Sequence, residues 1–217
     1  MSYPINLNVE DKICVVLGGG HVAFRKICGL IEANARIILI APEICSDIKN
    51  LVDINQVEWR QQNYSSGCIP NGFIFIAATN DEEVNKLAAM EAAKKNMLVN
   101  QVTNKSANFT IPSVIRQGNL TLTISTEGLS PALSKYIRLY LENQFNENFA
   151  IWLERLSKIR DEVKNKIKTV QEREQFWRNV MSDENFLLVQ SGELDKAEVN
   201  ICNALNSYRS KSQDGSY

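Results

Sequence analysis

The sequence predicts an α/β protein: a parallel sheet covered by helices, then a hairpin with one helix, then a helical region. Short apolar runs alternate with helical patterns over the first hundred residues, and three consecutive glycines follow the first apolar run. After residue 130, apolar residues keep helical spacing almost to the end of the chain. We expect a sheet domain over residues 1–112, a hairpin and helix over 113–146, a helical domain over 147–209 and a flexible tail over 210–217.

Five short apolar segments predict the strands of the sheet. The first, Ile13–Leu17, is continuously apolar, as in a strand buried on both faces. Helical spacing over His21–Ala33 and Asp81–Lys95 indicates βαβ units and therefore parallel strands. The other four strands are expected at Ile37–Ala41, Val57–Arg60, Phe73–Ala78 and Met97–Asn100.

The second half of the chain has a different pattern. Ser113–Arg116 and Leu120–Ser125 flank a short turn, which predicts a hairpin. Ser130 followed by Pro131 is typical of a helix start, with serine as the N-cap and proline at the first helical position. Helices are expected from there to about residue 208, and the charged segment Lys164–Arg178 is expected to form a solvated helix face.

The composition excludes several classes of protein. The 217 residues carry 24 Lys and Arg against 25 Asp and Glu, and this net charge of −1 argues against a nucleic-acid partner. No apolar stretch approaches the ~20 residues that span a bilayer, and no secretory leader is visible. Five scattered cysteines without a CxxC pair indicate reduced thiols and no metal site. We therefore expect a cytoplasmic protein without a membrane partner.

The segment Gly18-Gly19-Gly20-His21-Val22-Ala23 fits the pattern G-x-G-x-x-G/A between a strand and a helix. Gly18 permits the tight turn, Gly20 lets the backbone approach a pyrophosphate, and the small Ala23 lets the helix pack closely on the strand. The helix N-terminus then offers free N–H groups to phosphates. The pattern predicts a bound dinucleotide in a Rossmann domain, and the alternative is a glycine turn that only allows tight packing.

Residues after two other strands are expected to border this cofactor, because ligands of parallel sheets bind at the carboxyl ends of strands. Pro42 and Glu43 follow the second strand, and Glu43 is a candidate for the ribose hydroxyls. No Arg or Lys stands there to receive a 2′-phosphate, so NAD is favoured over NADP. Thr79, Asn80 and Asp81 follow the fourth strand, where their alternative role is helix capping.

Five strings are more specific than the glycine pattern alone. They are VVLGGGHVAFRK (Val15–Lys26), AATNDEEVN (Ala77–Asn85), NFTIPSVI (Asn108–Ile115), STEGLSPALSKYIR (Ser125–Arg138) and EREQFWRNVM (Glu172–Met181). In this order and spacing, the chain from about residue 5 to residue 205 resembles the precorrin-2 dehydrogenase family. That family also occurs as the dehydrogenase–chelatase module of siroheme synthase.

The resemblance implies an NAD-binding Rossmann domain, a small dimerisation region at 113–146 and a helical C-terminal region. It implies the oxidation of precorrin-2 to sirohydrochlorin with NAD⁺ in siroheme biosynthesis. Some members of the family also insert ferrous iron into sirohydrochlorin. A homodimer is implied as well, with the tetrapyrrole in a cleft near the nicotinamide.

The resemblance also indicates residues for the substrate. Asn100 ends the fifth strand, and Ser125, Thr126, Gly128 and Ser130 lie in a segment similar to the family's substrate-proximal loop. The alternative for this loop is a plain strand-to-helix connection capped by Ser130.

A tetrapyrrole substrate bears many carboxylates, so basic side chains are expected in its cleft. Lys135 is the first candidate, and the others are Lys105, Arg116 and Arg138. Each of them has the alternative of an ordinary surface charge.

One departure from the family concerns acid–base catalysis. The family string N-x-x-D carries the favoured general acid/base, whereas this chain has Thr103 and then Asn104 at that place. A hydroxyl or an amide does not accept a proton near neutral pH. The remaining candidates are Glu127 in the glycine-containing loop and His21, the single histidine. Their alternatives are an exposed carboxylate and a structural or solvent-facing imidazole.

Two other functions are weighed beside the dehydrogenase. A catalytically impaired NAD- and tetrapyrrole-binding carrier or regulatory protein would explain Thr103. A redox-sensing regulator that binds DNA is disfavoured by the net charge and by the lack of a helix-turn-helix pattern.

Overall fold

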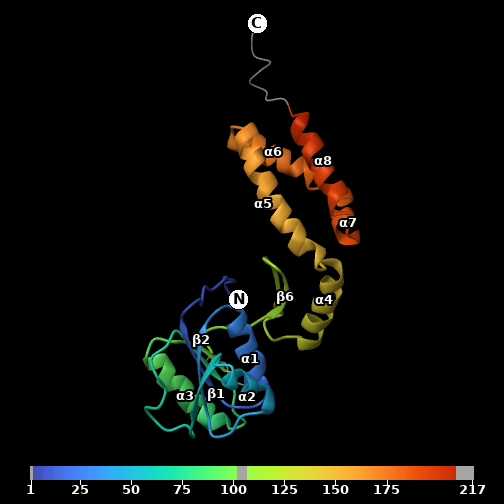
Figure 1. Cartoon of the computed structure of the whole chain (residues 1–217). Coiled ribbons are helices and arrows are strands. Elements are labelled where there is room, and N and C mark those ends of the chain that lie inside the picture. The colour runs from blue at the N-terminus through green and yellow to red at the C-terminus, as the bar shows by residue number, and fades with distance from the viewer. Residues whose placement is uncertain (1, 102–106, 209–217) are drawn as a thin grey trace. The chain divides into compact units, whose positions relative to one another are not determined.

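The computed structural model describes residues 2–101 and 107–208 (Figure 1). The chain divides into two compact units, Met1–Ile111 and Pro112–Tyr217, and each is described here by itself. The division of the second unit near residue 146 remains a prediction. The expected tail at 210–217 lies outside the described residues.

The first unit contains a five-stranded parallel sheet, which confirms the predicted fold class. The strand order is β3-β2-β1-β4-β5, so the chain reverses direction across the sheet between β1 and β4. In open parallel sheets, such a reversal opens the crevice in which ligands bind. The strands are β1 (Ile13–Leu17), β2 (Arg36–Ala41), β3 (Val57–Gln61), β4 (Ile74–Ala77) and β5 (Leu98–Gln101).

Both faces of this sheet are covered by helices. Successive side chains of a strand point to opposite faces, so Cys14 and Val16 of β1 pack with Ile27 of α1 (His21–Glu32) on one side. Val15 and Leu17 pack on the other side, against the alanines of α3 (Glu82–Lys94). This double burial explains the uninterrupted apolar run of the first strand.

The first unit contains one helix that the sequence analysis did not predict. The helix α2 (Ser46–Asp53) follows β2 and packs on the same face of the sheet as α1. It is eight residues long, and Ile48 is its one buried residue. Ile48, Leu51 and Val52 stand at i, i+3 and i+4 and contact the same core, so a helical period is present. The helix is shorter than the roughly ten to twelve residues over which such a period is recognised, which explains why it was missed.

The second unit begins with the predicted antiparallel hairpin of β6 (Ser113–Gln117) and β7 (Leu120–Ile124). Gly118 has a φ of 57°, in the left-handed region that favours glycine. A Cβ at this position would lie 2.9 Å from the Cβ of Ala150, so both backbone angle and space require glycine.

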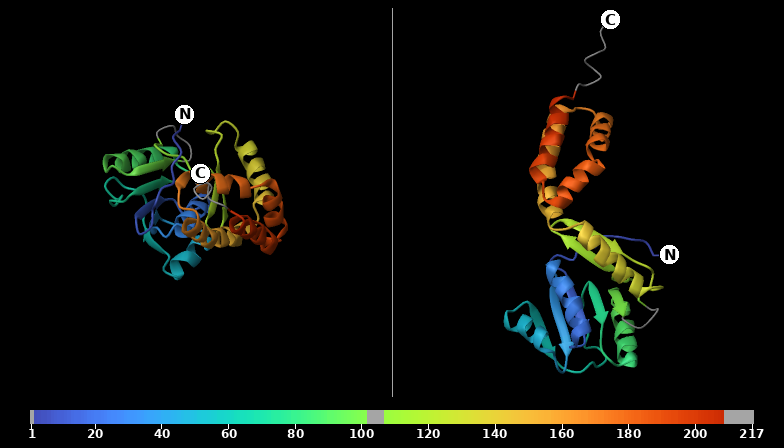
Figure 2. Two further views of the ribbon diagram at one scale, coloured as in Figure 1. Left: turned by 90° about the horizontal axis from the view of Figure 1, so that it is seen from above. Right: turned by 90° about the vertical axis from the view of Figure 1, so that its right-hand side faces the viewer.

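Up to residue 208, where the described part of the chain ends, five helices follow: α4 (Pro131–Gln144), α5 (Asn148–Lys166), α6 (Val170–Val180), α7 (Asp183–Ser191) and α8 (Leu194–Asn206). Helices α5 to α8 pack together around an apolar core that includes Trp152, Phe176 and Ile201 (Figure 1 and Figure 2). None of the helices described is both long and apolar enough to cross a membrane.

The charged segment Lys164–Arg178 is not one solvated helix face. It contains the end of α5, a break, and most of α6, and Ile167 within the break is 1% exposed. Thr169 begins α6 by accepting a hydrogen bond from the N–H of Glu172, and its hydroxyl donates to the carboxylate of that residue. Because charged residues lie on both sides of the break, the sequence pattern resembles one continuous solvated helix.

Candidate cofactor site at the glycine turn

Gly18 joins β1 to α1 where two backbones come close. Its φ is 116°, and a Cβ would lie 2.4 Å from the carbonyl oxygen of Ala78. Its N–H donates a hydrogen bond to the carbonyl oxygen of Ile40 in β2, at 2.9 Å. The turn is therefore held between the ends of β2 and β4, and only glycine fits there.

Gly19 is required even more strictly, although the sequence pattern treats this position as variable. A Cβ on Gly19 would lie 1.9 Å from the carbonyl oxygen of Glu43. The carbonyl oxygen of Gly19 also accepts a hydrogen bond of 2.9 Å from the N–H of Cys45. The segment that leaves β2 is thus bound directly to the glycine turn.

Gly20 has a different environment, because a Cβ there would meet nothing within 4 Å. Gly20 is the N-cap of α1, with no side-chain cap and no acidic residue in the first turn of the helix. Open space, uncapped N–H groups and the positive end of the helix dipole all suit a phosphate group. Ala23 is fully buried, as the third position of the pattern requires, and Val22 is half-buried.

The predicted residues after β2 lie beside this turn. Pro42 and Glu43 are exposed, and the backbone of Glu43 packs on Gly19. The carbonyl oxygen of Pro42 accepts a hydrogen bond from Nε2 of Gln61, at 3.3 Å. The structure therefore brings Glu43 and the glycine turn together, as the expected ribose contact requires.

The residues after β4 form a hydrogen-bonded turn. The hydroxyl of Thr79 donates to Oδ1 of Asn85 at 2.8 Å, and Nδ2 of Asn85 donates to the carbonyl oxygen of Thr79. Asp81 caps α3 by accepting hydrogen bonds from the N–H groups of Glu83 and Val84. The capping role is therefore present, and the exposed Asn80 and Asp81 and the half-buried Thr79 remain predicted cofactor neighbours.

His21, the first residue of α1, is exposed and forms an ion pair with Asp47, with 3.7 Å between Nδ1 and Oδ2. Asn100 is buried, and its Nδ2 donates a hydrogen bond of 3.0 Å to the carbonyl oxygen of Phe109. The side-chain amide therefore joins the end of β5 to the segment around Phe109. Thr103 and Asn104 lie outside the described residues. The roles predicted for these four residues remain predictions.

In the second unit, the loop from Ser125 to Ser130 is closed by its own hydrogen bonds. Oγ1 of Thr126 accepts from the N–H of Ser130 at 3.2 Å and lies 3.0 Å from Oγ of Ser134. Oγ of Ser130 accepts from the N–H of Leu133, which confirms its predicted capping of α4. The loop therefore has a definite shape before any ligand binds.

Two successive residues of this loop have left-handed backbone angles. The φ of Glu127 is 52° and that of Gly128 is 81°. Glu127 is exposed, and its N–H donates to Oγ of Ser125 at 3.2 Å. A positive φ is uncommon for glutamate, and such strained residues cluster at functional sites.

The basic candidates differ in their surroundings. Lys135 of α4 is exposed, whereas Arg138 is paired with Glu142 at 2.7 Å. Lys105 lies outside the described residues. One basic residue was not singled out from the sequence: Lys26 of α1 is half-buried, and burial, together with the nearby charge of Arg25, lowers its pKa.

Comparisons with known proteins agree with this geometry. Residues 5–113 match the family model described as "Putative NAD(P)-binding", which confirms the expected cofactor-binding domain. Residues 148–205 match the model described as "Sirohaem synthase dimerisation region". The latter covers α5 to α8, whereas we expected the dimerisation region at 113–146.

Two similar proteins are siroheme synthases. The one from Photorhabdus laumondii subsp. laumondii is 30% identical over 200 residues, covering 91% of this chain and 43% of that protein. The one from Pseudoalteromonas translucida is 32% identical over 209 residues, covering 95% of this chain and 44% of that protein. The chain thus spans less than half the length of these relatives.

A solved structure, "SirC, precorrin-2 dehydrogenase", is similar over 95% of this chain and 100% of its own. The TM-score is 0.75 and the sequence identity is 26%. The similarity therefore extends through both compact units.

Proposed function

We propose, on the premise that this chain belongs to the NAD(P)-binding family matched by residues 5–113, that it is an NAD-dependent precorrin-2 dehydrogenase of siroheme biosynthesis. The reaction would convert precorrin-2 to sirohydrochlorin. The similarity to SirC over all of that protein and nearly all of this chain carries the proposal. The glycine turn supports it, because its open side suits a dinucleotide.

The cofactor would be held by the turn after β1 and the N-terminus of α1. Gly20 leaves room for a pyrophosphate, and the first N–H groups of the helix donate to it. The exposed carboxylate of Glu43 would accept hydrogen bonds from ribose hydroxyls, which favours NAD over NADP. When bound, NAD⁺ supplies the acceptor for a hydride from the substrate.

The oxidation also requires that a proton leave the macrocycle. Glu127 is the candidate base in the second unit, since a carboxylate accepts a proton and Gly128 beside it leaves space around the loop. His21 and the segment with Thr103 and Asn104 are the other candidates. A general base contributes about 10²–10⁴-fold, so water acting in its place would leave a slow but measurable dehydrogenase.

The assembly proposed is a homodimer. Leu133, Tyr136 and Tyr140 of α4 expose 49%, 67% and 57% of their surface, which is an unusual number of large apolar side chains for one solvated helix. The dimerisation model matched by residues 148–205 supports self-association of the second unit. The five cysteines are free thiols, which suits the cytoplasm.

Purified protein mixed with precorrin-2 and NAD⁺ tests the activity. The absorbance of NADH and the tetrapyrrole spectrum should change together, with one NADH for each sirohydrochlorin. If both ligands bind without turnover, the protein is the carrier that Thr103 suggests. If neither ligand binds, both functions are wrong.

Insertion of ferrous iron is a further proposed activity and is tested with sirohydrochlorin and Fe²⁺ or Co²⁺. We expect Thr103→Asp to raise the rate of dehydrogenation or metal insertion, because it restores the carboxylate of the family string. Thr103→Asn is the matched control, since it has the same size without the charge. Equal rates for both variants would mean that another group moves the proton.

A further inference from the structure

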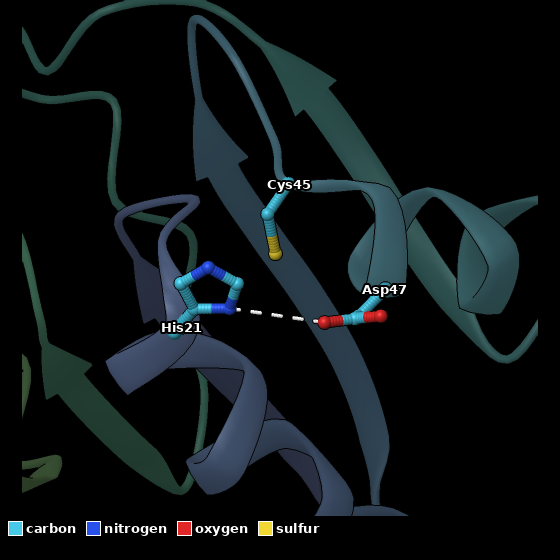
Figure 3. A group of neighbouring side chains, drawn as sticks. All are labelled: His21, Cys45 and Asp47. Atoms are coloured by element: carbon cyan, nitrogen blue, oxygen red, sulfur yellow. Dashed lines mark ion pairs between the residues drawn. The ribbon is translucent and has the colours of Figure 1, made fainter.

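Three side chains with metal-ligating atoms meet beside the glycine turn. His21 begins α1, Cys45 is the N-cap of α2, and Asp47 lies in the first turn of α2. One nitrogen, the sulfur and one carboxylate oxygen lie within 4.8 Å of one another. Figure 3 shows the imidazole, the thiol and the carboxylate around a common space.

The backbone holds these residues in place. The N–H of Cys45 donates to the carbonyl oxygen of Gly19 at 2.9 Å, and His21 is two residues from that glycine. Gly19 packs so closely on Glu43 that no side chain fits between the two segments. Ile48, the neighbour of Asp47, is fully buried and anchors the start of α2. Ligands on such anchored elements need little rearrangement to close around an ion.

The distances suit a small tetrahedral ion. With metal–nitrogen and metal–oxygen bonds near 2.0–2.2 Å and a metal–sulfur bond near 2.3 Å, ligand atoms of a tetrahedral site lie about 3.3–3.8 Å apart. Nδ1 of His21 and Oδ2 of Asp47 are already 3.7 Å apart. The remaining distances are at most 4.8 Å and need to shorten by no more than about 1.5 Å.

The donor set indicates which ions would bind. Imidazole and thiolate together favour borderline-soft divalent ions such as Zn²⁺ and Co²⁺, whereas Mg²⁺ and Ca²⁺ prefer oxygen ligands. Three protein ligands leave the fourth position of a tetrahedral ion to water or another ligand. The His21 side chain is 81% exposed and that of Asp47 is 47% exposed, so ions from solution reach the site.

We propose that His21, Cys45 and Asp47 form a binding site for a zinc-like transition-metal ion. All three residues belong to the first unit, and the site requires neither a dinucleotide nor a tetrapyrrole. A negative result for the metal site would therefore leave the proposed dehydrogenase function unaffected, and the reverse also holds. Because the thiol and the imidazole must lose their protons to bind, the affinity falls as the pH is lowered.

Titration of chelator-treated full-length protein with Co²⁺, without NAD or tetrapyrrole, tests the site. We expect one Co²⁺ per chain, a thiolate-to-cobalt charge-transfer band, and the intense visible bands of tetrahedral cobalt. Added Zn²⁺ should bleach these bands by displacement. The absence of a charge-transfer band at one equivalent would overturn the proposal.

Variants identify the ligands. Cys45→Ser should abolish the charge-transfer band, and His21→Ala and Asp47→Asn should weaken Co²⁺ binding at least ~10-fold. The controls are Cys202→Ser in the second unit and Asp53→Asn at the other end of α2, and both should bind as the parent does. Circular dichroism checks folding, and His21→Ala at an exposed position decides the test if Cys45→Ser is unfolded. Equal loss in targets and controls would show non-specific binding and overturn the site.

Discussion

The N–H of Cys45 donates a hydrogen bond of 2.9 Å to the carbonyl oxygen of Gly19. This bond joins the segment after β2 to the turn after β1, two segments that are far apart in the chain. It places Glu43 beside the proposed phosphate site and Cys45 beside His21. One backbone contact therefore organises both the candidate cofactor site and the proposed metal site.

Gly19→Ala should destabilise the first unit. The added Cβ would lie 1.9 Å from the carbonyl oxygen of Glu43, so the segment after β2 must move. Such overpacking typically costs about 1–3 kcal/mol and is expected at the upper end here, because backbone rather than a flexible side chain is displaced. Urea unfolding measures the loss, and a stability equal to that of the parent would contradict the close packing of this turn.

Gly20→Ala should leave the stability almost unchanged but weaken the binding of NAD. Gly20 has a φ of −90°, which alanine adopts, and its Cβ would meet nothing within 4 Å, so the free energy of unfolding should change by less than about 1 kcal/mol. The new methyl group would occupy the space proposed for the pyrophosphate, so NAD affinity should fall about 10-fold or more. Calorimetric titration with NAD measures this loss. An unchanged affinity would mean that the pyrophosphate does not bind beside Gly20.

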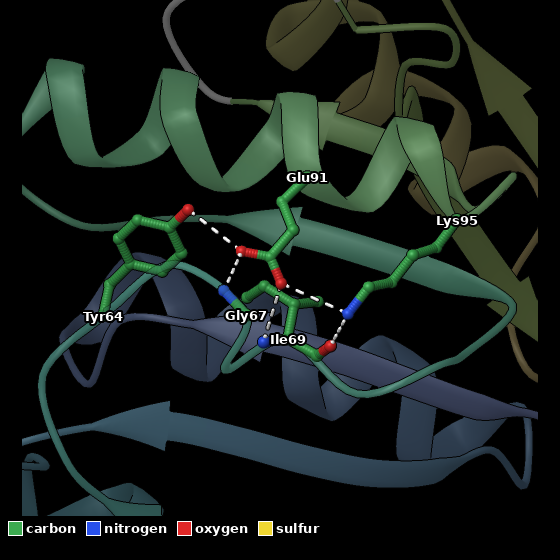
Figure 4. Close-up of polar contacts among 5 residues, drawn as sticks. All are labelled: Tyr64, Gly67, Ile69, Glu91 and Lys95. Carbon is green, nitrogen blue, oxygen red and sulfur yellow. Dashed lines mark hydrogen bonds and ion pairs between the residues drawn. The ribbon is translucent and has the colours of Figure 1, made fainter.

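Glu91→Gln should weaken the first unit and change its response to acid. The Glu91 carboxylate accepts hydrogen bonds from the hydroxyl of Tyr64 at 3.1 Å, from the N–H groups of Gly67 and Ile69, and from Lys95 (Figure 4). Burial alone would raise the pKa of Glu91, but these four donors outweigh it, so the pKa lies below its usual value. The carboxylate therefore stabilises the fold above the pKa of the unfolded chain, and this stability is lost as the pH falls through the lowered pKa.

At neutral pH, we expect Glu91→Gln to lower the free energy of unfolding by about 1–3 kcal/mol, because the charge is lost and an NH₂ group replaces one of the two oxygens that accept these hydrogen bonds. In acid, Glu91 of the parent becomes protonated and its stabilising effect is lost. The free energies of unfolding of the parent and of Glu91→Gln should therefore converge as the pH falls below ~4. Urea unfolding across this pH range measures the difference. Glu10→Gln, at an exposed position before β1, is the control and should follow the parent at every pH. A difference that stays constant with pH would contradict the lowered pKa.

Tyr140→Glu should dissociate the proposed homodimer. Tyr140 and its neighbours on α4 expose large apolar surfaces, and a buried charge at their interface would lack a partner. We expect at least a 10-fold weaker dimer by sedimentation equilibrium, a change of about 1.4 kcal/mol. Met90→Glu on α3 is the matched control, because Met90 is also an exposed apolar residue, at 51%. If Tyr140→Glu leaves the dimer unaffected, α4 is not the dimer interface, and the helices of residues 148–205 become the expected interface.

Much of the fold could be predicted because its signals are local. The apolar run of β1 reports burial on both faces, and Ser130-Pro131 reports the start of α4. The helix α2 was missed because its apolar residues Ile48, Leu51 and Val52 show helical spacing over only eight residues. The break at Ile167 was missed because the charges on both sides resemble a continuous solvated helix.

The strands, the glycine turn after the first of them and the family resemblance could be predicted from short strings of neighbouring residues. That Gly19 has no room for a side chain, and that His21 faces Cys45 and Asp47, became visible only in the folded chain. These contacts exist because β1 and β2 pair in parallel, with Leu17 beside Ile40, which brings the two strand exits to the same edge of the sheet. Pairing register is a property of the folded sheet, and no local pattern of residues encodes the distance between two exits.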